Sequence, residues 1–375
     1  MKRACGDAQR ATVRFFTFPR EKVRIMKFSN FLFPASMDPA KDHQVIEETL
    51  REAQLCDELG MEMLWLAEHH FDGICAYVDP VTFAAALAAS TKQIHIGFAV
   101  AQMSLHHPVR MAEQMALIDN ISKGRLVVGL GRGTAYNIYD YQGYGIDPAE
   151  AYERLLEAEE LMIKAWTTEN LEHKGKYWNL RLPLLRPRPY TKPHPFIVRA
   201  CSSEEAMLGM ARAGRPFLMN IQSNEVTKHR MDLYRKTMRE SGFDEATVAR
   251  NVDDTWVWRN IFVGETDAEA ERLALPAFAT QQAFRSAMRE KVYQEQGLLL
   301  KQEAAPAARN QVQHSMLCGS PDTVTEALAE IDGIGVGGLI LVFRIGPMPH
   351  EVAASSIRLF MSKVAPQFRK KSPAH

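Results

Sequence analysis

Residues 62–80 decide the fold, and they read EMLWLAEHHFDGICAYVDP. The stretch 62–68 has the length of a buried strand, and its centre, 63–67, is apolar. Asp79 and Pro80 then mark a helix start, because an N-cap oxygen accepts an otherwise unpartnered backbone N–H and proline at the first helical position has no N–H to satisfy. The stretch therefore predicts one strand followed by one helix.

The same strand-then-helix unit recurs along the chain, beginning at residue 26. We expect strands at residues 27–34, 62–68, 93–100, 125–130, 195–200, 216–220, 256–263 and 337–343. Helix starts of the same kind stand at Asp38-Pro39, Asp147-Pro148 and Ser320-Pro321. The alternation predicts an α/β fold, a single (β/α)8 TIM barrel rather than a doubly wound sheet. We expect its insertions at the C-terminal face of the strands, where such barrels carry their active sites.

Two segments interrupt the alternation and one precedes it. Residues 167–195 contain five prolines and predict an irregular excursion or a short hairpin before the fifth strand. Residues 285–315 predict a second insertion, which we interpret as a lid over the barrel mouth. Residues 1–25 carry seven basic residues against two acids and no apolar run, which predicts a disordered basic leader rather than a secretory signal. The barrel is assigned to residues 26–370.

The composition limits the class of partner. Forty-five basic and forty-five acidic residues cancel, so the chain lacks the positive surplus that binding to nucleic acid or to an anionic membrane requires. The five cysteines are odd in number and never spaced as C-x-x-C, which argues against a disulfide framework or a structural zinc. No apolar run reaches the roughly 18 residues of a membrane span. We expect a cytoplasmic protein that binds small molecules.

An acid and two imidazoles arrive together at the end of the second expected strand, as Glu68-His69-His70. Side chains alternate along a strand, so His69 is expected on one side and Glu68 and His70 on the other. Histidine titrates near neutral pH and suits proton transfer. We therefore predict His69, His70 and Glu68 as the catalytic residues and no metal. There are two alternatives. The two histidines could be structural, or they could belong to a metal site completed by His106 and His107.

A glycine-rich turn, Gly131-Arg132-Gly133, follows the fourth expected strand. Glycine lets the backbone approach a ligand closely, and the guanidinium of Arg132 suits a phosphate. A dinucleotide-binding fold would need a helix directly after this turn. Residues 134–145 show no helical period, so the sequence argues against that fold.

A second candidate anion site follows the fifth expected strand, where Ser203 occupies an N-cap position. A helix start presents free N–H groups and the positive end of the helix dipole, and both attract anions. Capping alone would also explain Ser203. Because Arg132 and Ser203 follow neighbouring strands, we interpret the two together as a phosphate cradle.

Five blocks occur together in a family-specific order: Lys27-Phe28-Ser29-Asn30-Phe31-Leu32, Glu68-His69-His70-Phe71, His107-Pro108-Val109-Arg110, Ser122-Lys123-Gly124-Arg125 with Gly131-Arg132-Gly133, and Cys318-Gly319-Ser320-Pro321. With this spacing, residues 26–368 resemble bacterial luciferase and the flavin-dependent monooxygenases related to it. The resemblance implies a TIM barrel that takes reduced FMN (FMNH2) from a separate NAD(P)H-dependent reductase. It further implies that the enzyme binds O2, forms a C4a-hydroperoxyflavin and oxidises a small organic substrate, commonly as a homodimer.

The same resemblance implies roles for individual residues. His69 matches the catalytic histidine, Arg132 the phosphate-binding arginine, and Ser203 a serine at the flavin phosphate. Ala99-Val100 matches a cis peptide bond, not involving proline, beside the flavin ring. The cofactor-binding residues that we expect are Ala99, Val100, Gly131, Arg132, Gly133, Ala200, Ser202 and Ser203.

Three positions depart from luciferase and argue against light emission. Gly131 stands where luciferase has a reactive cysteine, Ser202 where it has an acid, and Ala206 where it has a hydroxyl at the phosphate. An aromatic-rich mouth is still expected to shield the chemistry from water. Its members are Phe31, Trp65, Phe98, Tyr136, Tyr139 and Trp258, some of which would be barrel packing.

Three other functions stay open. The same fold could use a deazaflavin for hydride transfer without O2. The chain could also be a non-catalytic flavin-binding partner subunit, although a subunit freed from catalysis need not keep His69. A metal-dependent barrel hydrolase is the remaining alternative.

Overall fold

The computed structural model describes residues 26–71, 73–133, 138–297 and 308–369. Within these ranges, parallel strands close into a barrel, since β9 pairs with β10 and β12 lies between β10 and β1. The barrel strands are β1 (Lys27–Leu32), β2 (Met63–Leu66), β3 (His95–Phe98), β5 (Leu126–Gly131), β8 (Phe196–Cys201), β9 (Phe217–Met219), β10 (Trp256–Val263) and β12 (Gly338–Val342). All eight predicted strands are confirmed, and so is the TIM barrel. The predicted leader, 1–25, lies outside the described residues.

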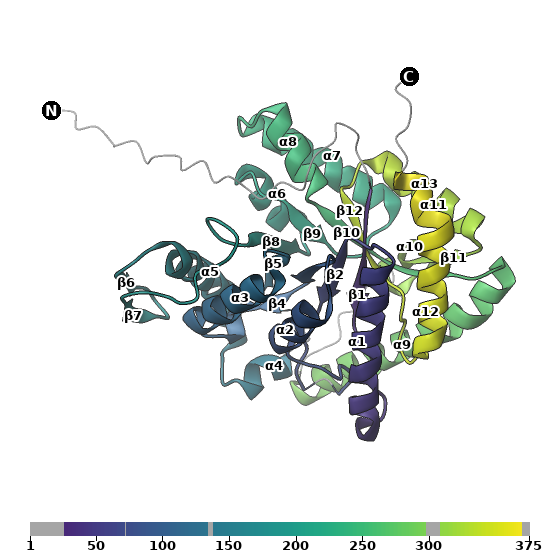
Figure 1. Ribbon diagram of the computed structural model, residues 1–375, viewed down its shortest axis with the longest axis horizontal. Helices are drawn as coiled ribbons and strands as arrows, with labels where there is room; N and C mark the ends of the chain where they lie inside the picture. Colours follow the sequence, from purple (N-terminus) through teal and green to yellow (C-terminus); the bar gives the residue numbers. More distant parts are fainter. Residues whose placement is uncertain (1–25, 72, 134–137, 298–307, 370–375) are drawn as a thin grey trace.

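Helices surround the barrel and cover the outer sides of the strands (Figure 1). They are α1 (Asp42–Glu58), α2 (Pro80–Ser90), α3 (Pro108–Ser122), α5 (Ala151–Thr167), α6 (Glu204–Arg212), α7 (Asn224–Glu240), α8 (Glu245–Asp253), α9 (Asp267–Glu295), α11 (Pro321–Ile334), α12 (His350–Leu359) and α13 (Ala365–Arg369). The π-helical turn Phe360–Val364 joins the last two.

The predicted helix starts are confirmed. Asp79 Oδ1 accepts the N–H groups of Val81 and Thr82 at 2.9 and 3.1 Å, and the Ser320 hydroxyl caps α11 at Thr323. The other two pairs open short 3-10 turns, η1 (Pro39–Lys41) and η3 (Pro148–Glu150), which lead directly into α1 and α5. Local capping chemistry therefore sets where these helices begin.

Large aromatic side chains fill the barrel. The rings of Trp65 and Trp256 meet edge to face at 5.6 Å, and the ring centroids of Phe31 and Trp258 lie 4.4 Å apart. Trp65, Phe31 and Phe98 are fully buried, so these three members of the predicted aromatic mouth belong to the core. Tyr136 lies outside the described residues.

The first insertion, 167–195, contains a hairpin, which was one of its two predicted structures. The hairpin does not lie where we expected it. Strands β6 (Leu171–Lys174) and β7 (Asn179–Leu182) pair antiparallel and lie beside α5 at the edge of the molecule (Figure 1). His173 Nε2 lies 3.1 Å from a carboxylate oxygen of Glu157 on α5. The segment then ends against α3, where the Thr191 N–H donates to Asp119. The expectation that this insertion lies at the C-terminal face was wrong, because these contacts hold it along α5.

The second insertion begins as an extension of α9, which runs to Glu295. Residues 298–307 lie outside the described residues, so the lid stays a hypothesis. Beyond them, η4 (Ala308–Asn310) and α10 (Val312–Ser315) lead into β11 (Met316–Gly319), an extra strand that pairs with the end of β10.

The segment after β5 also differs from expectation. A short helix, α4 (Ile138–Gly143), occupies part of the range in which no helix was predicted. The dinucleotide-binding fold is nevertheless excluded by the closed barrel. Before α3, β4 (Ala101–Gln102) pairs with the end of β5 and leads into η2 (Met103–Leu105).

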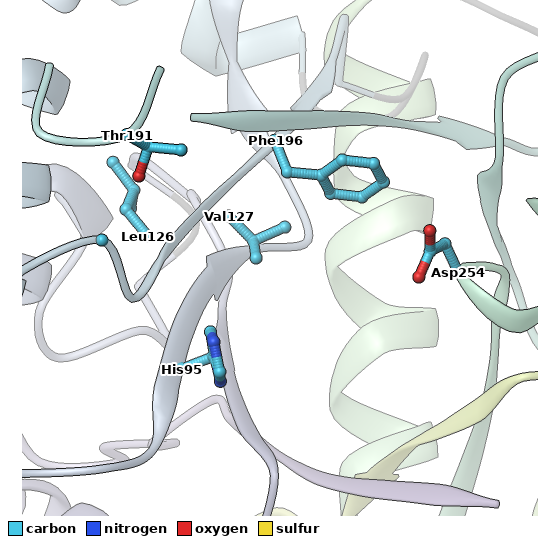
Figure 2. A pocket seen from close by; sticks show the side chains of 7 residues that line it. His95, Leu126, Val127, Thr191, Phe196 and Asp254 are labelled. Carbon is cyan, nitrogen blue, oxygen red and sulfur yellow. The ribbon is translucent and has the colours of Figure 1, made fainter. Parts of the chain in front are cut away.

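Figure 2 shows residues that line a small hollow at the opposite end of the barrel from the strand ends discussed below. Its lining includes His95 at the start of β3, Phe196 at the start of β8 and Asp254 just before β10. Active sites of such barrels lie at the C-terminal ends of the strands, so this hollow is not the candidate site. Among the described helices, none combines the length and the apolar character needed to cross a membrane.

Candidate functional site

The three polar residues after β2 separate into two environments, as predicted. The imidazole of His69 is partly buried, and its ring meets the ring of Phe33, which follows β1, edge to face at 5.0 Å. Glu68 and His70 are buried and contact each other instead. The ring of His69 therefore faces Phe33, whereas the ring of His70 packs against Tyr144.

Glu68 is the centre of a buried polar cluster. One carboxylate oxygen lies 2.8 Å from His70 Nε2 and 2.5 Å from His106 Nε2. The other accepts the backbone N–H of Gln102 at 2.6 Å. Burial opposes ionisation, but the hydrogen bonds from His106 and His70 outweigh it and lower the pKa of Glu68 to about 2. Glu68 is therefore a carboxylate at neutral pH.

The Glu68 carboxylate favours the positively charged form of His106. Burial disfavours its charged form, but the hydrogen bond to Glu68 and the charge of that carboxylate raise the pKa of His106 above its ordinary value. Its side chain is 24% exposed, against 1% for Glu68. The pair is a partly buried ion pair in which only the histidine reaches the surface.

Glu68, His70 and His106 also place three possible metal-ligand atoms within 4.8 Å of one another. The predicted alternative metal site is thus partly assembled, with His106 among its members. Two ligand atoms of one tetrahedral ion, each about 2.0–2.1 Å from it, would lie about 3.3 Å apart. The N–O separations of 2.5 and 2.8 Å are shorter and correspond to hydrogen bonds. The geometry favours a proton-linked cluster over a metal centre.

The candidate phosphate cradle lies at the ends of β5 and β8. These strands are neighbours, with Leu130 opposite Arg199, so the turn with Arg132 and the helix start at Ser203 follow adjacent strands. Arg132, Ala200, Ser202 and Ser203 are exposed. The Ser203 hydroxyl accepts the Ala206 N–H at 3.2 Å and so caps α6. The predicted neighbourhood is confirmed, and its polar groups are accessible to an anion.

Gly131 and Gly133 are required in the turn because neighbouring side chains leave no room for a Cβ at either position. A Cβ built at Gly131 would lie 2.5 Å from the Val100 side chain. Gly133 has a φ of +76°, and a Cβ there would lie 2.0 Å from the Gln102 side-chain oxygen. The Ala99–Val100 peptide bond is cis, as the resemblance implied. The side chains of Val100 and Gln102 therefore pack directly against the backbone of the glycine turn.

A shallow apolar hollow lies at the same end of the barrel. Phe33, whose ring touches His69, forms part of its wall, opposite Phe284 and Arg285 of α9. Ile74, from the loop after β2, adds a further apolar surface. The hollow and His69 thus share one aromatic wall.

Sequence reasoning missed Gln102, Asp140 and Phe33. Gln102 binds Glu68, which is 34 positions away, and Asp140 accepts the backbone N–H of His70, which is 70 positions away. No local motif marks such pairs. Gln102 stands two residues beyond the Ala99-Val100 pair, and that position was the one available signal.

A family model described as luciferase-like monooxygenase matches residues 26–337. Among curated proteins, the alkanal monooxygenase alpha chain of a Kryptophanaron alfredi symbiont is 27% identical over 226 residues, which are 60% of this chain and 62% of that protein. The chain therefore matches less than two thirds of the length of such curated relatives.

Solved structures match over more of the chain. The monooxygenase RslO1 from Streptomyces bottropensis has a TM-score of 0.78 and 29% identity, covering 92% of this chain and 100% of that one. The oxygenating constituent of 3,6-diketocamphane monooxygenase from Pseudomonas putida, in complex with FMN, has a TM-score of 0.75, 21% identity and coverage of 92% and 99%. An F420-dependent secondary alcohol dehydrogenase has a TM-score of 0.69, 15% identity and coverage of 92% and 100%. The last two show a shared fold.

Proposed function

Because the chain belongs to the luciferase-like monooxygenase family, we propose that it is an oxygenase that uses reduced FMN and O2 to oxidise a small organic substrate. The observation that carries the proposal is the convergence of His69 with the exposed Arg132 and the Ser203 helix start at one end of the barrel. These groups supply proton transfer and phosphate binding.

The residues fit the phosphate and ring of a flavin. Arg132 would donate to the phosphate, and Ser203 with the N–H groups of α6 would complete its cradle. Gly131 and Gly133 let the turn pack tightly against Val100 and Gln102, and the turn would hold Arg132 beside the flavin phosphate. Ala99, Val100, Ala200 and Ser202 complete the proposed cofactor-binding set.

The chemistry is divided between cofactor and protein. Reduced FMN, when bound, supplies the electrons that activate O2. His69 accepts or donates a proton at its imidazole nitrogen, beside Phe33. The apolar side chains around Phe33 would face the substrate, and they suit a small, mainly apolar molecule.

A separate reductase is the proposed source of reduced FMN. The name of the Pseudomonas putida neighbour describes an oxygenating constituent, which implies another component in that system. We extend the same division to this chain and propose a separate NAD(P)H-dependent flavin reductase as its partner, in the cytoplasm.

The experiment that tests the function is anaerobic titration with photoreduced FMN, followed by rapid mixing with O2 and recording of absorbance. A transient that is neither reduced nor oxidised flavin supports the oxygenase. Binding of reduced FMN without a transient would instead favour a non-catalytic flavin-binding subunit. Exchange of hydride with a deazaflavin under anaerobic conditions would favour the alternative suggested by the F420-dependent neighbour.

Ser203 allows capping and phosphate binding to be separated. Ser203→Ala should cost about 1 kcal/mol of stability through loss of the cap and should weaken FMN binding. Ser203→Asp should keep the cap but bring a negative charge to the phosphate, so it should bind FMN more weakly than Ser203→Ala while unfolding like the wild type. Urea unfolding and fluorescence titration measure the two effects. Wild-type FMN affinity in Ser203→Asp would place the phosphate elsewhere.

We also propose a homodimer. The outer face of α3 exposes Leu117 and Ile121, one helical turn apart, at 51% and 41%. Such a pair on an early helix suits burial against a second copy. Leu117→Glu combined with Ile121→Glu should therefore give a monomer in analytical ultracentrifugation, whereas Leu184→Glu, at an exposed apolar site near β7, should leave the dimer intact. A monomeric wild type would contradict the proposal.

A further inference from the structure

The Glu68 cluster joins loops that follow different strands. Glu68 and His70 follow β2, Gln102 ends β4, and His106 follows η2. All three partners donate to the Glu68 carboxylate, at 2.8 Å from His70, 2.6 Å from Gln102 and 2.5 Å from His106. One buried acid therefore fixes the relative position of these strand ends.

A second layer extends the cluster to α4. The Gln102 amide donates to the Glu68 backbone oxygen at 3.0 Å and to the Asp140 carboxylate at 2.6 Å. The other Asp140 oxygen accepts the His70 N–H at 3.1 Å. The Tyr144 hydroxyl, just past α4, lies 3.4 Å from His70 Nδ1. The helix after the glycine turn is thus tied to the loop that carries His69.

The cluster also reaches the glycine turn. Gln102 pairs with Gly131 in the β4–β5 register. Its side-chain oxygen lies so close to Gly133 that a Cβ there would collide with it. A shift of Gln102 would therefore displace both the Glu68 carboxylate and the turn proposed to face the flavin.

His69 lies between two members of this cluster in the chain. Its two chain neighbours are held by side-chain hydrogen bonds, and the N–H that follows it is held by Asp140. The backbone on each side of His69 therefore has little freedom. The imidazole is oriented by a loop whose position depends on Glu68.

We propose that His106 is a positioning residue, which holds Glu68 in place and thereby aligns His69 with the Gly131–Gly133 turn. The inference rests on the proposed function for the roles of His69 and the turn. His106 supplies the cation without which a buried carboxylate would be costly. It acts through Glu68 and makes no contact with the reacting atoms.

We call the Glu68–His106 pair the clamp. The pH range over which it is stable follows from the pKa shifts of its two residues. The pKa of Glu68 is lowered, so its stabilising contribution is present above its unfolded pKa and lost as the pH falls towards about 2. The pKa of His106 is raised, so its contribution is full below its unfolded pKa and lost as the pH rises through the folded value. Among the described residues, the titratable groups close to this pair are Asp79, His70, Asp140, Tyr77, Tyr141 and Tyr144. The clamp therefore weakens on the alkaline side.

Two substitutions of His106 test the proposal. His106→Phe removes the donor, whereas His106→Gln restores a neutral N–H donor to Glu68. His173→Gln is the matched control, because His173 also forms a buried pair with a glutamate, 3.1 Å from Glu157 on α5. The readouts are FMN affinity against pH and the backbone amide NMR shifts of His69, Gly131 and Gly133 in the full chain.

We expect His106→Phe to weaken FMN binding at least about tenfold, as loss of a hydrogen bond to a charged group predicts, and to shift all three amide signals. His106→Gln should recover most of the affinity and of the shifts, and it should lose the alkaline decline in affinity of the wild type. His173→Gln should behave as the wild type. The amide shifts do not depend on flavin chemistry, so they test the clamp even if no O2 transient is found.

Three results would overturn the inference. Wild-type amide shifts and FMN affinity in His106→Phe would show that His106 positions nothing. An equal loss of FMN affinity and equal amide shifts in His173→Gln would show that the effect of His106→Phe comes from a general loss of stability. A stoichiometric metal in the purified wild type that His106→Phe lacks would make His106 a ligand instead.

Discussion

The His69→Ala variant is expected to bind FMN as the wild type does and to lose about 10²- to 10⁴-fold in the proton-dependent step of oxidation. The imidazole is partly buried beside Phe33, and its removal takes away the group proposed to move the proton while leaving the Arg132 and Ser203 cradle intact. Stopped-flow mixing of the reduced complex with O2, repeated across pH, measures the step.

His43→Ala supplies the control for this experiment. His43 is an exposed histidine on α1, at the outside of the barrel. It should leave both the rate and its pH dependence unchanged. If His69→Ala retained the wild-type rate, the catalytic role would have to move to another group of the barrel mouth.

The Arg132→Ala variant is expected to bind FMN about 10- to 100-fold more weakly, because it loses charge-assisted hydrogen bonds to the phosphate. Riboflavin has no phosphate, so its affinity should not change. Titration of both ligands against both proteins measures the effect directly. The comparison separates phosphate binding from any disturbance of the ring site.

Arg110→Ala is the matched control for Arg132→Ala. Its side chain is 71% exposed on α3 and pairs only weakly with Glu113 across one helical turn, at 3.5 Å. Neither ligand should distinguish this variant from the wild type. An equal loss of FMN and riboflavin in Arg132→Ala would instead show that Arg132 supports the turn and does not bind phosphate.

The barrel strands could be predicted because each is a short apolar run that ends in turn or capping residues. The helix α4 could not, because its six residues give too short a pattern and Asp140 is held by contacts with Gln102 and His70. A hairpin was one of the two structures that the sequence predicted for 167–195. The position of the hairpin could not be predicted, because the contact between His173 and Glu157 depends on the tertiary fold.

The candidate site also has a part that the sequence could predict and a part that it could not. His69, Arg132 and Ser203 stand at strand ends or at a helix start, and local sequence identifies such places. The hydrogen bond between Glu68 and His106 joins residues 38 positions apart, and it depends on the ends of β2 and β4 lying close together. His106 was noticed as a possible metal ligand, whereas the distances show a hydrogen-bonded ion pair.

The β6–β7 hairpin lies along α5, at the edge of the molecule (Figure 1). Lys176 at its turn is 65% exposed and pairs with Glu153 of the same helix. A fluorophore attached at this turn would therefore sit on the flank of the barrel, away from the proposed flavin site at the carboxyl ends of the strands. The hairpin thus offers an anchoring point for immobilising or labelling the enzyme while its turnover is followed.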